Sequence, residues 1–487
     1  MAMHKKVCII GAGVSGLRAA HKLLTAKDTL LLPSDVIILE AQARIGGRIK
    51  TDTTLSKLGL TYDLGAAWFH DALTNSVLYS SIEDGSFDVE SDGYFNDKDM
   101  CYYAKEHPGR VDAAGLKLEQ VVEDIEKFIE IHFLHSLGVP DVSLSEIVAL
   151  YMKKQDCFLT APQKQLCGRM CRYLELWYGI SAHKMSGKHA VMSHQGRNLY
   201  NKKGYSFLVE KLQSQTKCTI MTSEQVTTIQ RDISGQNFRH LVTTAAGTEI
   251  AADYLVVTVP QSILALDAEH SYGLTWDPPL PARIQQSLKT IHFGALGKVI
   301  FEFSEIWWDA SEDAFEVLAD ENTGADVATA SGLDISPFMY PIYVFNYATI
   351  QPSAASLVIL TQSPVTEYLE AKPHLAWAYM KPMLAKISMQ QICEPINTIV
   401  TDWTQNPYSR GSYSALHVGD DPSDAIIQLS GEYESCGLGI SSTVRFAGEH
   451  TIADGAGCVH GAYDSGERAA DWILKHLAEN HQAKNAS

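Results

Sequence analysis

A glycine-rich turn between a short apolar strand and an apolar helix constrains the fold of this chain more than any other stretch. Residues 7–10 form an apolar run, and residues 17–24 show the apolar spacing of a helix. Between them, Gly11 permits a tight turn, Gly13 lets backbone N–H groups approach a pyrophosphate, and Gly16 lets the helix lie close to the strand. The helix N-terminus then faces the phosphates with the positive end of its dipole. The pattern predicts an α/β, Rossmann-like dinucleotide-binding fold.

The next predicted strand carries residues that select the nucleotide. Residues 36–40 form a second apolar run ending in Glu40, whose carboxylate is placed to accept hydrogen bonds from a ribose diol. Just beyond it, Arg44, Gly47 and Arg48 bring a second glycine turn and two cations, which a nicotinamide cofactor does not need. Such a turn can hold the pyrophosphate or the far half of a longer cofactor. The stretch from Glu40 to Arg48 resembles the extended FAD motif of the flavin amine oxidases.

The resemblance extends over essentially the whole chain. It rests on the RIGGR stretch just described and on residues 294–298 (GALGK), 407–414 (PYSRGSYS) and 446–451 (FAGEHT). In detail the match is closest to fungal polyamine oxidases of the spermine-oxidising type. The resemblance implies an FAD cofactor and the flavin amine oxidase fold.

This fold joins two domains built from interleaved segments. The resemblance implies a discontinuous, Rossmann-like FAD-binding domain of residues 1–80, 203–290 and 390–487. It implies an α+β substrate-binding domain of residues 81–202 and 291–389. The length agrees, because 487 residues are too many for one compact core.

Three patterns describe the expected substrate domain. Apolar spacing over residues 116–129 predicts an amphipathic helix with a solvated acidic face. Thr160, followed by a proline and by Gln163, predicts the start of another helix, which continues to Tyr178. Residues 309–334 are acidic and without clear periodicity, which predicts a mobile surface insertion.

The glycine pattern and the resemblance together imply a set of cofactor-binding residues. Val226 is similar to the residue whose backbone meets the adenine, and Glu449 to the carboxylate beside the ribityl and phosphate groups. Ser412 stands where monoamine oxidases carry the cysteine that bonds to FAD, so noncovalent FAD is expected. The full set is Gly11, Gly13, Gly16, Glu40, Arg44, Gly47, Arg48, Ala67, Trp68, Val226, Trp403, Gly448 and Glu449.

The resemblance also implies residues that act on the substrate. Lys298 is expected to reach the flavin N5 through a water, although a lysine in an apolar strand can also extend from a sheet edge. His70 is expected to orient the amine, Asn198 to line the pocket, and Tyr408 to form an aromatic wall. Cys458 stands at the usual second wall position, which leaves the cage geometry open. The expected substrate-binding residues are Trp68, Trp177, His460 and Tyr463, although an aromatic side chain at helical spacing is also common in a core.

Charge and cysteine usage limit the partners. The net charge of −18 argues against nucleic acid and agrees with a polycationic substrate, although solubility alone also explains an acidic protein. The nine scattered cysteines form no zinc-site pattern, so we expect no metal and reduced thiols. No apolar run is long enough to span a membrane, and no signal peptide is evident, so we expect a cytoplasmic protein.

The sequence therefore predicts an FAD-dependent polyamine oxidase with a polyamine and O2 as its small-molecule partners. By resemblance, a C–N bond of spermine or of an acetylated polyamine is oxidised: the carbon next to the nitrogen loses hydride to flavin N5, water hydrolyses the resulting imine, and O2 becomes H2O2. One alternative is a binding protein on an oxidase scaffold, as in fungal proteins described as corticosteroid-binding. Another is an oxidase of a different amine or of an amino acid. The exact amine, the bond cleaved and the oligomeric state stay open.

Overall fold

The glycine-rich βαβ unit forms as predicted. In the computed structural model, β1 (Met3–Ile10) leads into α1 (Val14–Thr25), and β2 (Val36–Leu39) pairs in parallel with β1. Gly11 has a φ of +107°, which favours glycine, and a Cβ on Gly16 would lie 2.0 Å from the Gly11 carbonyl oxygen. The roles predicted for these two glycines are confirmed.

The structure describes residues 2–135, 138–191, 196–320, 335–431 and 437–486. Within these ranges, none of the helices has the length and the apolar character that crossing a membrane requires.

The βαβ unit belongs to an eight-stranded sheet assembled from three parts of the chain. Its order is β13-β10-β11-β12-β1-β2-β9, with β21 paired to β12. β12 pairs in parallel with both β1 and β21, so early, middle and late segments meet at the centre of the sheet. The added strands are β9 (Thr219–Met221), β10 (Val226–Gln230), β11 (His240–Thr244), β12 (Glu249–Val257), β13 (Thr275–Asp277) and β21 (Val444–Phe446).

Both faces of this sheet are buried, as the continuous apolar runs require. Along β1, Val7 and Ile9 pack with α1, α10 and α16, whereas Cys8 and Ile10 pack with α11, α12 and α15. The covering helices are α10 (Ser206–Thr216), α11 (Gln261–Leu264), α12 (Ala282–Ser287), α15 (Pro422–Ser430) and α16 (Val459–Ala486).

A second, six-stranded sheet has the order β19-β15-β18-β17-β16-β7 and is antiparallel except between β16 and β7. Helices α13 (Val365–Ala371) and α14 (Ala376–Leu384) share a core with it. The strands are β7 (Cys101–Tyr103), β15 (Gly297–Glu302), β16 (Ala314–Val317), β17 (Ile342–Asn346), β18 (Ser356–Thr361) and β19 (Asn397–Val400).

The prediction of a surface insertion over residues 309–334 is wrong where the structure describes it. β16 lies inside this segment and is buried at all four positions. Its Glu316 carboxyl is buried as well, and burial raises the pKa of Glu316 to about 8. The acidic composition therefore hid a core strand, and residues 321–334 lie outside the described part of the chain.

Helices form the rest of this half of the molecule. Thr160 and Gln163 make the predicted capping box of α7, but this helix ends at Met170 rather than continuing to Tyr178. The N–H of Arg172 bonds the Arg169 carbonyl, an i−3 contact that tightens the last turn, and α8 follows. The helices are α4 (Ala113–Leu116), α5 (Leu118–Leu134), α6 (Leu144–Lys154), α7 (Ala161–Met170), α8 (Tyr173–Tyr178) and α9 (Gly187–Ala190).

Several short elements cross the predicted domain boundaries. β5 (Trp68–Phe69) pairs with β8 (Leu199–Asn201), which also pairs with β6 (Gly93–Tyr94), although residues 1–80 and 81–202 were expected in different domains. Likewise β19 comes from the segment after residue 390 but pairs with β15. The domain division therefore stays a prediction.

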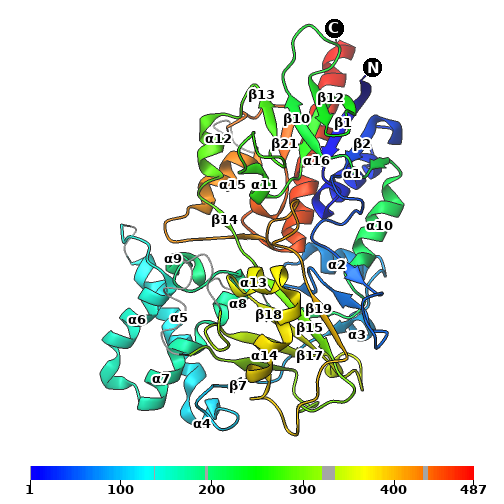
Figure 1. Ribbon diagram of the computed structural model, residues 1–487. Coiled ribbons are helices and arrows are strands. Elements are labelled where there is room, and N and C mark those ends of the chain that lie inside the picture. Colours follow the sequence, from blue (N-terminus) through cyan, green and yellow to red (C-terminus); the bar gives the residue numbers. More distant parts are fainter. Residues whose placement is uncertain (1, 136–137, 192–195, 321–334, 432–436, 487) are drawn as a thin grey trace.

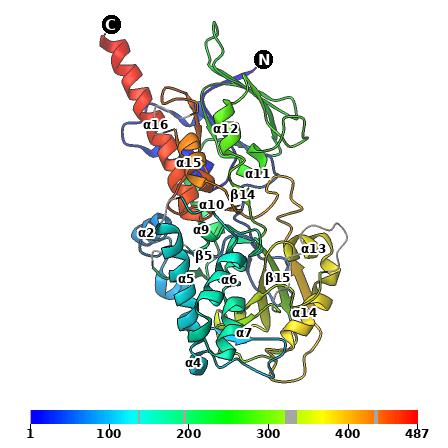
Figure 2. The same ribbon diagram turned by 90° about the vertical axis from the view of Figure 1, so that its left-hand side faces the viewer.

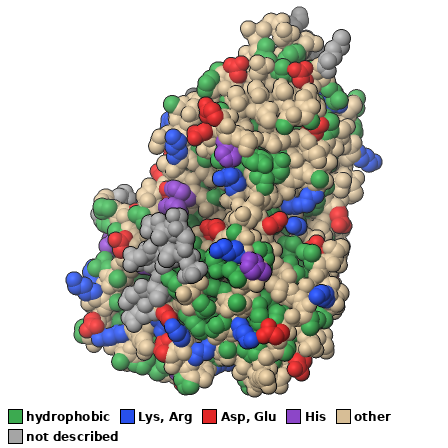
Figure 3. All heavy atoms as spheres, viewed as in Figure 1, with side chains coloured by type: hydrophobic (Ala, Val, Ile, Leu, Met, Phe, Trp, Pro, Cys, Tyr) green, Lys and Arg blue, Asp and Glu red, His purple; other side chains and the backbone are tan. Residues whose placement is uncertain are grey.

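The figures show how the two sheets are arranged. Both termini lie at the end of the molecule that holds β1 and β12, and α4 to α7 lie at the opposite end (Figure 1). In the turned view, α5 to α7 lie on one side of β15 and α13 and α14 on the other (Figure 2). On the face drawn in Figure 3, acidic and basic side chains are mixed rather than gathered by sign. On this face, the net charge of −18 therefore does not take the form of one continuous acidic patch.

Candidate active site

A cavity of about 1120 Å³ is lined by residues from both large sheets. At one end lie Gly11 and Glu40, just past the carboxyl ends of β1 and β2, which is the usual ligand position in a parallel sheet. At another lie Lys298 of β15, Tyr343 of β17 and Leu360 of β18. A single ligand in this cavity therefore contacts segments from the whole chain.

The nucleotide end is shaped by Glu40 and by the start of α1. The Glu40 carboxylate accepts hydrogen bonds from the N–H groups of Ala12 and Gln42, each at 2.8 Å. Burial raises the pKa of Glu40, and these two hydrogen bonds oppose the shift. Gly13 caps α1 without a side chain and lines the cavity, so the helix N-terminus is open to an anion. Val226, at the start of β10, lines the same end.

The two arginines of the second glycine turn have different positions. Arg44 donates to the carbonyls of Gly47, at 2.6 Å, and of Ile49, at 3.0 Å, and does not line the cavity. Arg44 therefore stabilises the glycine turn from behind and does not contact the cavity. Gly16 has a similar indirect role, because it allows the close packing of α1 but does not line the cavity. Arg48 and Gly47 do line the cavity.

On the cavity wall, the half-buried Arg48 forms an ion pair with the buried Glu449. Arg48 Nη1 lies 2.8 Å from Glu449 Oε1 and also donates to the Ser412 carbonyl at 3.0 Å. The N–H groups of Ser414, at 3.2 Å, and of Gly457, at 3.0 Å, also donate to the Glu449 carboxylate. Burial works against ionisation, but the nearby Arg48 and His450 and the hydrogen bonds from the Ser414 hydroxyl and the Arg48 side chain leave the pKa of Glu449 below its usual value. The adjacent Gly448 lines the cavity with a φ of +136°.

Lys298 points from β15 into the interior rather than extending from a sheet edge. Its side chain is buried, and Nζ donates to the carbonyls of Asp63 and Gly65, each at 2.6 Å. Burial lowers the pKa of Lys298 to about 8, although Asp63 opposes the shift. Nζ lies 5.7 Å from the centre of the Trp68 ring, so the amine stands beside an aromatic wall of the cavity.

Aromatic and small residues complete this wall. Trp403 donates from Nε1 to the Leu64 carbonyl at 2.8 Å, and both line the cavity. A Cβ on Gly65 would lie 1.9 Å from the Arg48 carbonyl oxygen and 3.2 Å from the Trp403 ring, so this close packing requires glycine. Ala67 also lines the cavity and adds little bulk.

His70 and Asn198 come together at the far end of the cavity. His70 Nδ1 lies 3.0 Å from Asn198 Oδ1, and both residues line the cavity. Trp177 of α8 lines it too and is 37% exposed, so it is not a core residue.

Sequence reasoning missed the acid at this end. Glu126 of α5 lines the cavity, and its Oε1 accepts a hydrogen bond from the Tyr173 hydroxyl at 2.7 Å. It was grouped with the solvated acids of an amphipathic helix, and helical periodicity alone does not separate it from them.

The aromatic wall predicted at Tyr408 lies elsewhere. The Tyr408 ring packs edge-on against Tyr272, with centroids 5.3 Å apart, and its hydroxyl lies 3.4 Å from Gln225 Oε1, next to Val226. This is the nucleotide end of the cavity, so the wall role predicted for Tyr408 is not supported.

The missed aromatic residue is Tyr413, which lines the cavity and bonds the Trp177 carbonyl through its hydroxyl. A Cβ on Gly457, beside Cys458, would lie 3.3 Å from its ring. The sequence could have suggested Tyr413 as a cavity residue, because it directly follows Ser412, which was already expected to lie beside the flavin.

Two predicted substrate residues do not line the cavity. α16 begins at Val459, and its helical spacing turns Val459 and Ala462 toward the cavity but His460 and Tyr463 away. Tyr463 instead packs under the Arg18 guanidinium, 4.3 Å from the ring centre. Neither residue therefore has the position on the cavity wall that direct contact with the substrate requires.

Comparison with known proteins gives the class of this chain. A family model for flavin containing amine oxidoreductases matches residues 14–474, so the chain belongs to this family. Membership implies a flavin cofactor and a small-molecule amine substrate oxidised with O2.

The relatives of this chain include proteins named as oxidases and one named as a binding protein. The chain is 52% identical over 480 residues to a Candida albicans protein named Corticosteroid-binding protein, covering 98% of this chain and 97% of that one. It is 26% identical over 494 residues to Polyamine oxidase 4 of Oryza sativa subsp. japonica, covering 97% and 89%. It is 25% identical over 517 residues to the Homo sapiens Peroxisomal N(1)-acetyl-spermine/spermidine oxidase, covering 96% and 94%.

A solved structure of putrescine oxidase with bound putrescine shares the fold. Its TM-score is 0.68 at 17% identity, and the match covers 98% of this chain and all of that one.

Proposed function

We propose that this protein is an FAD-dependent polyamine oxidase. The observation that carries the proposal is the combination, in one cavity, of the buried Lys298, the His70–Asn198 pair and the Glu126 carboxylate beside Tyr173. A polyamine needs both a place for the nitrogen that reacts and an acid for a nitrogen that stays protonated.

The cavity fits an extended FAD. Glu40 offers acceptors for the ribose, the open N-terminus of α1 suits the pyrophosphate, and Arg48 with Glu449 lies farther along. Bound FAD would supply the oxidant for this chemistry, as an acceptor for the hydride of the carbon next to the amine nitrogen and a donor of electrons to O2, which would give H2O2. Serine forms no thioether, and the Ser412 hydroxyl donates to the Gly294 carbonyl at 2.9 Å, so we propose noncovalent FAD.

The protein side chains prepare the amine for oxidation. His70 and Asn198 supply ring and amide groups that hold a neutral nitrogen, whose lone pair assists hydride loss. Trp177 and Tyr413 present ring faces that suit an amine, whether neutral or cationic. We propose that the Lys298 amine, whose pKa burial lowers to about 8, holds a water near the reacting carbon. Tyr408 is reassigned to the nucleotide end.

A peroxide assay across amine classes tests this proposal. We expect H2O2 with spermine, spermidine or an N-acetylated polyamine, and little with monoamines or amino acids. Equal rates with monoamines would contradict the role of Glu126, and peroxide from amino acids alone would contradict the substrate class.

A binding function is the second candidate, because of the name of the 52% identical relative. The cavity lining includes many apolar side chains, which also suits a steroid. Binding of corticosterone without any peroxide from polyamines would favour this candidate. Cytoplasmic location stays a prediction.

A further inference from the structure

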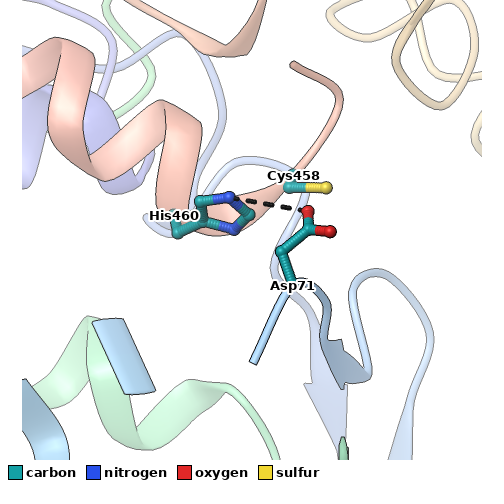
Figure 4. A group of neighbouring side chains, drawn as sticks. All are labelled: Asp71, Cys458 and His460. Carbon is teal, nitrogen blue, oxygen red and sulfur yellow. Dashed lines mark ion pairs between the residues drawn. The ribbon is translucent and has the colours of Figure 1, made fainter. Parts of the chain in front are cut away.

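Three side chains gather where the loop after β5 meets the start of α16. Donor atoms of Asp71, Cys458 and His460 all lie within 4.8 Å of one another, although the loop and the helix are far apart in the sequence (Figure 4). Asp71 and Cys458 line the cavity, and His460 lies behind them, 2% exposed. Two occupants have matching chemistry: a metal ion, or a cationic nitrogen of a substrate.

Asn75 distinguishes between these occupants because it fixes the tautomer of His460. Asn75 is 1% exposed, and its Oδ1 accepts from the N–H of Leu78 at 2.9 Å, which orients the amide. Its Nδ2 then donates to the His70 carbonyl at 2.7 Å and faces His460 Nδ1 at 3.2 Å. His460 Nδ1 must accept, so the ring proton lies on Nε2. A metal needs the Nε2 lone pair, and this tautomer withholds it.

The Nε2–H of His460 is directed at Asp71 instead. Nε2 lies 3.9 Å from Asp71 Oδ2 and forms no hydrogen bond within the described part of the chain. Burial lowers the pKa of His460, although Asp71, Asp464 and Asp454 oppose the shift. A neutral ring beside the Asp71 carboxylate does not cancel its charge.

The backbone at Asp71 has an unusual conformation. Asp71 has a φ of +54°, a left-handed conformation that aspartate tolerates better than most residues. Its carbonyl accepts the N–H groups of Thr74 and Asn75, which closes the turn before α2 (Ser76–Glu83). The carboxylate therefore sits on a defined turn, directly after His70.

We propose that Asp71 is an ammonium subsite whose carboxylate, oriented by the Nε2–H of His460, binds a protonated nitrogen of the polyamine. The inference rests on the proposed polyamine oxidation and deepens it. Asp71 and Glu126 then hold charged nitrogens while a neutral one lies at the His70–Asn198 pair. His460 acts as a positioning residue, which explains its place behind the cavity wall.

Anaerobic reduction of the holoenzyme by spermine separates binding from chemistry. The spermine dissociation constant and the limiting rate of flavin reduction come from the same titration. Asp71→Asn keeps the shape but loses the charge, and we expect the dissociation constant to rise roughly ten- to hundredfold. The limiting rate should change by less than about threefold. His460→Leu should raise the dissociation constant in the same direction, and His460→Gln, which keeps a donor, should recover part of the loss. Asp28→Asn, at an exposed position, is the matched control.

The outcomes distinguish the subsite from the function on which it rests. A wild type that spermine does not reduce overturns the proposed function and the subsite with it. A wild type that spermine reduces, with an unchanged dissociation constant in Asp71→Asn, overturns the subsite alone. A fall in limiting rate or flavin content without weaker spermine binding assigns Asp71 a structural role and also overturns it. Stoichiometric Zn²⁺ binding by untagged holoenzyme, lost in both Asp71→Asn and Cys458→Ser, would assign the cluster to a metal instead.

Discussion

Replacing Lys298 with methionine should change how stability depends on pH. Lys298 is 6% exposed, and burial lowers its pKa from 10.5 to about 8. The unfolded chain therefore binds this proton at a pH where the folded chain has already lost it. Stability rises with pH between about 8 and 10.5, because the unfolded state binds more protons there. Methionine has no such proton, so the variant lacks this rise.

The size of the effect follows from the pKa shift. The lowering of the Lys298 pKa from 10.5 to about 8 corresponds to about 3 kcal/mol over the whole window. Between pH 7 and pH 9.5, about 2 kcal/mol of this is expected. The free energy of unfolding of the wild type should therefore gain about 2 kcal/mol over that of Lys298→Met. At pH 7, Lys298→Met loses two hydrogen bonds to carbonyls, which destabilises the variant, but it also removes a buried charge, which stabilises it. The free energies of unfolding of the two proteins should therefore be similar at pH 7.

Urea unfolding followed by tryptophan fluorescence measures this difference. Both proteins are unfolded at pH 7, 8 and 9.5 with the same free FAD concentration, and ionisations common to both cancel in the difference. Lys289→Met, at an exposed position, is the control and should show no such trend. A difference between wild type and Lys298→Met that stays flat, or that falls with pH, would refute the reasoning.

Three further predictions concern the cofactor and the substrate. Acid precipitation should release yellow flavin into the supernatant, because Ser412 cannot form a thioether; colour kept in the pellet would contradict noncovalent binding. Glu40→Ala should weaken FAD binding by roughly 1.5–3 kcal/mol, or about ten- to hundredfold in dissociation constant measured by flavin fluorescence, and unchanged affinity would mean that Glu40 does not contact the ribose. Glu126→Gln should raise the KM for spermine about tenfold with little change in kcat, since it removes a charge from the cavity wall beside Tyr173; an equal loss in kcat would point to a structural role instead.

Local sequence patterns predicted the parts of this protein that depend on backbone geometry. The turn requires glycine at position 11, and the close approach of α1 to this turn requires glycine at position 16. The spacing of the glycines was therefore enough to predict the βαβ unit. The Thr160 capping box involves neighbours in the sequence and was equally clear. Lys298 was predicted only from the family resemblance. The sequence pattern of an apolar strand with one lysine does not show whether that lysine is buried or which groups it contacts.

The errors arise where tertiary packing decides. β16 was missed because a buried Glu316 looks the same in a sequence as a solvated one. His460 and Tyr463 were placed in the pocket because the start of α16 was unknown, and the start sets which residues face the cavity. Tyr408 and Tyr413 are five positions apart in one loop, and only the fold separates the nucleotide end from the substrate end. A contact between segments that are far apart in the sequence, such as His70 with Asn198, cannot be predicted from the residues next to either one.

Anaerobic mixing of the purified protein with spermine tests the central claim most directly. Amine oxidation must transfer electrons to the bound flavin, so the account predicts that the yellow colour bleaches without oxygen and returns, with H2O2, when oxygen is admitted. Corticosterone should leave the oxidised flavin spectrum in place. A flavin that stays oxidised with spermine, spermidine and their N-acetylated forms would contradict the assignment as a polyamine oxidase.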